Sequence, residues 1–230
     1  MSVAEVESML EVAGEIVDLV KLGWGTAVVT PNLQEKLERY SAAGVPVMLG
    51  GTLTEIAIRQ GAVEGLIAWM RELGLRHVEV SDGTIALEPE VKTHLIGMLA
   101  SNGFTVLAEV GSKDAQFIMP PYVWVEQIER DLAAGAWKVI AEARESGTAG
   151  IYRASGEVRT GLIEEIAHAV DPQQIIFEAP RREQQVWLLT HFGTECNLGN
   201  IAPADVISLE TLRLGLRSDT VERFALDGGE

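Results

Sequence analysis

The chain alternates between short apolar runs and longer amphipathic segments, at the spacing of about 30 residues that repeated strand–helix units show. The apolar runs predict strands over residues 16–23, 45–51, 76–83, 104–111, 137–146, 174–180 and 195–200. The segments between them predict helices over 3–13, 32–42, 53–73, 89–101, 121–134, 160–169, 181–191 and 203–215. Glycines follow several predicted helices directly, where this residue commonly ends a helix: Gly44, Gly74, Gly103 and Gly135.

Repeated strand–helix units form parallel sheets through right-handed crossovers. The pattern fits one α/β domain over residues 1–230, either a (βα)8 barrel or a doubly wound sheet. The eight predicted helices favour the barrel, but only seven strands are predicted, because the chain begins on a helix. We therefore expect a TIM-type barrel that lacks its first strand.

One predicted strand carries charges where a buried strand should be apolar. In "KVIAEARESG" (138–147), the side chains of Lys138, Glu142 and Arg144 share one face, opposite a smooth apolar face. Buried charges are costly unless they are paired or used. This face is therefore predicted to point into a functional site.

The same alternation places glutamates near the carboxyl ends of four successive strands, where α/β enzymes hold their active sites: Glu79, Glu109, Glu142 and Glu178. Lys21, Lys138 and Arg144 are predicted to face the same space. Such carboxylates can bind a hard cation such as Mg²⁺, and basic side chains can hold an anion or transfer a proton. A ring of structural ion pairs would give the same pattern, so both interpretations stay open here.

Glycine-containing turns follow three of the strands: "GWGT" (23–26), "GGT" (50–52) and "NLGNI" (197–201). Glycine permits close approach of the backbone to a ligand, and the amides that begin the next helix can bind phosphate. An ordinary turn would look the same. The candidate ligand-binding residues are Gly50, Gly51, Thr52, Asn197, Gly199 and Asn200.

Composition and charge narrow the function class. The net charge of −16 argues against nucleic-acid binding, and no apolar stretch is long enough for a membrane helix. The acidic start "MSVAEVESML" lacks the basic region of a signal peptide, and a single cysteine, Cys196, permits no disulfide within the chain. We expect a cytoplasmic protein whose anionic substrate meets local positive charge.

Several segments together resemble the phosphosulfolactate synthase family. They are "VDLVKLGWGT", "GGTLTEIA", "VEVSDGTI", "GFTVLAEVG", "KVIAEARESGTAGIY", "IIFEAPRREQQVW" and "NLGNIAPADVISLETLRLGLRSDT". The resemblance runs from about residue 5 to 220 in unbroken order. It implies a (βα)8 barrel enzyme that adds sulfite to phosphoenolpyruvate with Mg²⁺, giving (2R)-phospho-3-sulfolactate. In the family this product leads to coenzyme M or to sulfolactate.

The resemblance also suggests roles for the charged residues. A cation on Glu109 and Glu142, with Glu79 or Glu178 nearby, would stabilise the negative charge that forms on the substrate. Lys138 would then protonate C2, on the face opposite the sulfite attack. Phosphate and sulfite would be held by Lys21, Arg144 and Arg181.

Family members begin with an extra strand that ends in an Asp-Lys-Gly turn, and this chain begins after it. The gap would leave two unpaired strand edges, which proteins normally cover. We therefore expect a homo-oligomer, or a barrel whose open seam is plugged locally. Two further possibilities stay open: a divergent paralogue with another nucleophile or substrate, and a non-catalytic barrel.

Overall fold

Seven parallel strands form the sheet in the computed structural model, which describes residues 1–111 and 118–224. Their order follows the chain, β1-β2-β3-β4-β5-β6-β7, which is the order of a barrel-type fold and not that of a doubly wound sheet. The predicted fold class, an α/β barrel type with seven strands, is confirmed. The strands are β1 Val20–Leu22, β2 Val47–Leu49, β3 His77–Val80, β4 Thr105–Val110, β5 Lys138–Ala141, β6 Ile175–Glu178 and β7 Leu198–Gly199.

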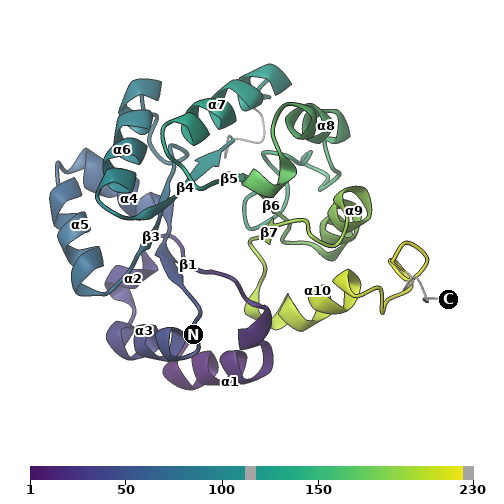
Figure 1. The fold of residues 1–230 in the computed structure, drawn as a ribbon, viewed down its shortest axis with the longest axis horizontal. Coiled ribbons are helices and arrows are strands. Elements are labelled where there is room, and N and C mark those ends of the chain that lie inside the picture. The colour runs from purple at the N-terminus through teal and green to yellow at the C-terminus, as the bar shows by residue number, and fades with distance from the viewer. Residues whose placement is uncertain (112–117, 225–230) are drawn as a thin grey trace. The chain divides into compact units, whose positions relative to one another are not determined.

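Helices connect the strands (Figure 1). The α-helices are α1 Val3–Ala13, α2 Thr26–Val29, α3 Leu33–Ala42, α4 Gly51–Arg59, α5 Val63–Glu72, α6 Pro89–Ser101, α7 Pro121–Ala133, α8 Thr160–Ala169, α9 Arg182–Phe192 and α10 Val206–Arg213. The described residues also form three short 3₁₀ helices, η1 Gly14–Ile16, η2 Pro172–Gln174 and η3 Pro203–Asp205. None of the helices within the described ranges is long and apolar enough to cross a membrane.

The prediction of eight helices was wrong in two places, since the described residues contain ten α-helices. The segment 53–73 forms two helices, because Gly61 adopts a left-handed backbone with φ of +65° and ends α4. The short helix α2 follows β1 in a region where no helix was predicted. The predicted helix-ending role of glycine is confirmed after α3, α5, α6 and α7, at Gly44, Gly74, Gly103 and Gly135, all with positive φ.

The chain divides into two compact units, whose boundaries fall at the end of β4, within α7 and within β5. Unit 1 comprises residues 1–110 and 126–139, and unit 2 comprises residues 111–125 and 140–230. The assignment of the whole chain to one domain stays a prediction.

In unit 1, strand register fixes which side chains share a face. Lys21 pairs with Met48, Met48 with His77 and His77 with Thr105, so these residues form one row across β1 to β4. Glu79, two residues after His77, lies on the same face by strand alternation. The opposite face is fully buried at Leu49, Val78 and Val106, and helices α4 and α6 pack beside β3.

In unit 2, β6 pairs with β7 in parallel, with Glu178 opposite Gly199. The rings of Phe177 and Phe192 stack with centroids 5.1 Å apart, which fixes α9 on β6. Helix α10 lies beside α9 (Figure 1).

Cys196 lies in unit 2 just before β7 and is buried, with 5% of its surface exposed. Burial raises the pKa of its thiol to about 12, although the charge of Arg213 acts in the opposite direction. The thiolate is the reactive form of cysteine.

We therefore expect a thiol reagent at pH 8 to label Cys196 only after the protein is denatured. Measurement of the intact mass would detect the added label. Rapid labelling of the folded protein would contradict the buried position of Cys196.

Candidate active site

Lys21 in unit 1 faces two glutamates that come from other strands. Its Nζ lies 3.0 Å from Oε2 of Glu79 and 3.9 Å from Oε2 of Glu109. Both glutamates are buried, whereas the Lys21 side chain is 27% exposed. The structure therefore brings together one predicted lysine and two of the four predicted carboxylates.

Glu79 is held by main-chain as well as side-chain contacts. The Gly51 amide donates to Glu79 Oε1 at 3.0 Å, and the Thr54 hydroxyl donates to the Glu79 carbonyl at 2.8 Å. Burial raises the pKa of the Glu79 carboxyl; the Lys21 ammonium lowers that pKa, and the nearby Glu109 charge raises it. A buried carboxyl with opposing influences on its pKa is typical of functional sites.

The predicted glycine turn at 50–52 forms the start of α4, with Gly50 as its N-cap residue and half-buried Thr52 in its first turn. A Cβ on Gly50 would lie 2.9 Å from the Gly23 Cα, so β1 and β2 approach closely there because both residues are glycines. The Gly51 amide already donates to a carboxylate. The phosphate-binding role predicted for this turn stays a prediction. A phosphate would have to compete with the Glu79 carboxylate for the Gly51 amide.

Replacing Gly51 with alanine should displace Glu79. A Cβ there would lie 2.1 Å from Ser81 Oγ and 2.9 Å from Glu79 Oε1, so these side chains must move. We expect a loss of unfolding free energy of about 1–3 kcal/mol, the usual result of overpacking. The matched control is Gly65→Ala on the exposed surface of α5, where a Cβ meets nothing within 4 Å.

The control variant should gain about 0.5–1 kcal/mol, because glycine weakens a helix interior. Denaturant unfolding of both variants is the measurement. Equal stability changes in the two variants would contradict the close packing of Gly51 against Glu79.

Glu55 is a buried glutamate that the sequence reasoning missed. It lies on α4 and is 0% exposed. Its Oε1 accepts from the Ser81 hydroxyl at 2.5 Å, and its Oε2 accepts from the amides of Thr84 at 2.7 Å and Ile85 at 2.6 Å. Glu55 therefore organises the segment that follows β3, the strand that carries Glu79. The only available sequence signal was an acidic residue on the buried side of a short helix.

Unit 2 contains the other two predicted carboxylates. Glu142 directly follows β5 and accepts from the Arg144 amide at 2.6 Å. Arg144 adopts a left-handed backbone with φ of +60°, which is uncommon outside glycine and concentrates at functional sites. Glu178 ends β6, and its Oε2 accepts from the Ala143 amide at 2.9 Å. Both carboxylates are thus tied to the segment that follows β5.

Arg181 is an exposed residue that contacts the same segment in unit 2. Its Nε donates to the Ser146 carbonyl at 2.7 Å, and a Cβ on Gly156 would lie 2.3 Å from its NH1 nitrogen. Gln184, which is buried, donates to the carbonyls of Gly147 and Gly156. The start of α9 therefore holds the loop that carries Arg144.

Two predicted residues lie at the amino-terminal ends of their strands. Lys138 begins β5 and is half-buried, and its Nζ lies 5.1 Å from the ring centroid of Trp137. Asn197 donates to the carbonyls of Gln173 and Ile175, at the beginning of β6. The role of each in the reaction stays a prediction.

Gly199 and Asn200 lie at the end of β7. A Cβ on Gly199 would lie 2.8 Å from Ile176 Cγ2, so the small residue allows β7 to approach β6. Asn200 has a φ of +57°, the conformation that turns a chain sharply after a strand. Packing and turn geometry account for both residues, and their predicted contact with a ligand stays a prediction.

Mg²⁺ binding by the predicted carboxylates stays a prediction, and any such ion would need ligands beyond the protein's own side chains. Among the residues that the structure describes, no group of three or more histidine, cysteine, aspartate or glutamate side chains could hold a metal ion. Mg²⁺ commonly takes one or two protein carboxylates and obtains its other ligands from water and substrate phosphate. Glu79 and Glu109, which lie near the same ammonium, match that pattern.

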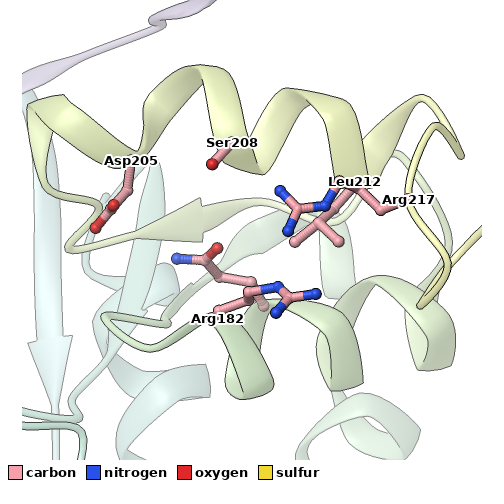
Figure 2. Close-up of a pocket in the computed structure, with 6 residues that line it drawn as sticks. Arg182, Asp205, Ser208, Leu212 and Arg217 are labelled. Carbon is pink, nitrogen blue, oxygen red and sulfur yellow. The ribbon is translucent and has the colours of Figure 1, made fainter.

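A cavity of about 100 Å³ lies between α9 and α10 in unit 2 (Figure 2). It is lined by Arg182, Gln185, Asp205, Ser208, Leu212 and Arg217. The Arg182 guanidinium pairs with Asp219. None of the predicted site residues lines this cavity.

Comparison with known proteins identifies related sequences over nearly the whole chain. The family described as (2R)-phospho-3-sulfolactate synthase (ComA) matches residues 1–219. A phosphosulfolactate synthase from Methanothermobacter thermautotrophicus is 38% identical, over 98% of this chain and 90% of the relative. A phosphosulfolactate synthase from Bacillus subtilis is 41% identical, over 90% of this chain and 83% of the relative. One from Methanocaldococcus jannaschii is also 41% identical, over 94% of this chain and 88% of the relative.

Solved structures share the fold at low sequence identity. A dihydrodipicolinate synthase from Agrobacterium tumefaciens has a TM-score of 0.60 at 11% identity, covering 97% of this chain and 72% of its own. The BexX/CysO complex of Amycolatopsis orientalis contains a chain with a TM-score of 0.59 at 13% identity, covering 100% of this chain and 89% of its own. These likenesses support the fold alone.

Proposed function

The chain belongs to the (2R)-phospho-3-sulfolactate synthase family, and from this premise we propose that it adds sulfite to phosphoenolpyruvate to form (2R)-phospho-3-sulfolactate. It is an enzyme of the phosphosulfolactate synthase type. The observation that carries the proposed reaction is the family match over residues 1–219, reinforced by three relatives of the same name.

The proposed reaction forms one carbon–sulfur bond and moves one proton. The sulfur lone pair of sulfite attacks C3 of phosphoenolpyruvate, and the electrons of the carbon–carbon double bond move to C2. Negative charge then spreads from C2 onto the substrate carboxylate, until a proton reaches C2. The enzyme must therefore bind two anions together, stabilise the added charge and supply one proton.

Basic side chains at the predicted site suit the first requirement. Lys21 presents its partly exposed ammonium beside Glu79 and Glu109. In the proposal it also contacts the anionic substrate, while Arg144 and Arg181 hold phosphate and sulfite. Charged donors make stronger hydrogen bonds to such anions than neutral ones do.

We assign Mg²⁺ to the carboxylates and propose Glu79 and Glu109 as its ligands. The sequence had predicted Glu109 and Glu142, with Glu79 or Glu178 nearby, so Glu142 and Glu178 stay candidates. Bound Mg²⁺ would neutralise developing negative charge on the substrate carboxylate. The residues themselves favour this assignment, because two buried glutamates would otherwise repel an anionic substrate.

Proton delivery to C2 falls to Lys138 in the proposal, the role that the family resemblance suggested for this residue. A cytoplasmic location and self-association through the end strands also stay part of the proposal. Light scattering of the purified chain would measure the oligomeric state.

An assay of the purified chain with phosphoenolpyruvate, sulfite and Mg²⁺ tests the proposed reaction. Mass spectrometry should detect a product that carries the atoms of both substrates and that requires both of them. EDTA should abolish its formation, and added Mg²⁺ should restore it. The absence of an adduct under these conditions would overturn the substrate assignment, and full activity in EDTA would overturn the metal assignment.

A further inference from the structure

We propose that Lys92, a buried residue of α6, is a positioning residue that fixes the Glu109 carboxylate opposite Lys21. The expected change in kinetics rests on the proposed function, whereas the expected change in structure can be measured without it. No feature of the sequence pattern had singled out Lys92.

Lys92 makes three contacts within unit 1. Its Nζ donates to the Glu109 carbonyl at 2.7 Å, and lies 2.8 Å from Asp131 Oδ2 and 3.4 Å from Asp82 Oδ1. Lys92 is 2% exposed and Asp131 is 0% exposed. An ammonium group has three donors and no acceptor, so three oxygen partners satisfy it completely.

The contacts join the elements that carry the two glutamates. Glu109 is the next-to-last residue of β4, where regular pairing between strands comes to an end. Lys92 provides a donor for its carbonyl at that point. Asp82 lies two residues after β3, the strand of Glu79. Lys92 therefore ties the end of β4 to the segment that follows β3, and Asp131 of α7 holds Lys92 in place.

Stability alone gives little reason for this arrangement. Taking a lysine and an aspartate out of water is costly, and an apolar pair of similar size often stabilises a protein equally well. Burial raises the pKa of the Asp131 carboxyl, while the Lys92 charge lowers that pKa. An apolar pair could replace neither the hydrogen bond to the Glu109 carbonyl nor the contact with Asp82. A fixed main chain limits where the Glu109 side chain can lie, and its Oε2 is 3.9 Å from Lys21 Nζ.

The test replaces both charges together as Lys92→Met/Asp131→Leu, because Lys92→Met alone would leave a buried unpaired carboxylate. We expect this pair of substitutions to fold and to lower kcat by at least about 30-fold, with a smaller change in KM, as expected when transition-state contacts are lost. The control Arg39→Met/Glu7→Leu removes an ion pair between α3 and α1 whose partners are 40% and 52% exposed, and should retain parental kcat.

A double-mutant cycle shows whether Lys92 acts through Glu109. If it does, adding Lys92→Met/Asp131→Leu to Glu109→Gln should cost little beyond Glu109→Gln alone, within about threefold, because coupled residues are not additive. If kcat instead falls by the product of the two separate factors, the proposal is overturned.

Crystal structures of the parent and of Lys92→Met/Asp131→Leu give the readout that needs no activity. The distance between Glu109 Oε2 and Lys21 Nζ should increase in the variant, while Glu79 keeps its contact with Lys21. An unchanged position of Glu109 would overturn the positioning role. An inactive parent would contradict the proposed function, and the crystal structures would then decide the role of Lys92 by themselves.

Discussion

Lys21→Met is expected to lower kcat/KM by at least about 1,000-fold, or about 4 kcal/mol of transition-state stabilisation. The substitution keeps most of the side-chain volume but removes the ammonium that lies 3.0 Å from Glu79 Oε2. It removes both the proposed contact with an anionic substrate and the compensation of a buried carboxylate. The measurement is steady-state kinetics with phosphoenolpyruvate and sulfite.

The control for Lys21→Met is Lys36→Met, the same chemical change at a residue of α3 that is 8% exposed. It should leave kcat/KM within about threefold of the parental value, a barrier change of under ~1 kcal/mol. A kcat/KM of Lys21→Met within tenfold of the parental value would contradict the role assigned to Lys21.

Lys21→Met should also make stability depend more strongly on pH. Without Lys21 the pKa of Glu79 rises further above its ordinary value of 4.5, because burial and Glu109 still raise it and only the Gly51 amide still lowers it. The folded state then binds a proton that the unfolded state has already released, so unfolding free energy falls as pH rises above 4.5. The loss relative to the parent should be small at pH 4 and larger at pH 8. Equal losses of unfolding free energy at pH 4 and at pH 8 would show that the pKa of Glu79 does not depend on Lys21.

Lys138→Ala is expected to lower kcat by at least about 100-fold, in the range that general acid catalysis contributes. The physical reason is the loss of the proposed proton donor to C2. The fold should remain, because Lys138 is only half-buried at the beginning of β5. Kinetics together with a thermal unfolding curve is the measurement.

Trp137→Leu is the matched control for Lys138→Ala. It removes the ring that lies 5.1 Å from Lys138 Nζ but keeps the ammonium, and Trp137 is 50% exposed. It should retain activity within about threefold, since an exposed cation–π contact contributes only about 0.5–1 kcal/mol. If Lys138→Ala retains as much activity as this control, proton donation by Lys138 is excluded and Lys21 becomes the candidate donor.

The alternation of side chains along the strands determined much of unit 1 from the sequence by itself. A period of two assigns every second side chain to one face, and this placed Lys21, Glu79 and Glu109 on a common side. The ion pairs between Lys21 and both glutamates agree with that assignment. The glycines that end α3, α5, α6 and α7 were likewise readable, because a left-handed residue after a helix strongly favours glycine.

Only the tertiary structure decided which helical charges are buried. Glu55, Lys92 and Asp131 lie on α4, α6 and α7, where a charged residue would ordinarily face solvent. Their partners are distant in sequence: Ser81 is 26 residues from Glu55, and Glu109 is 17 residues from Lys92. A periodic pattern describes the face of a single element, whereas these contacts depend on how a helix packs against the ends of two strands. That packing brings Lys92 to the Glu109 carbonyl and the Gly51 amide to the Glu79 carboxylate.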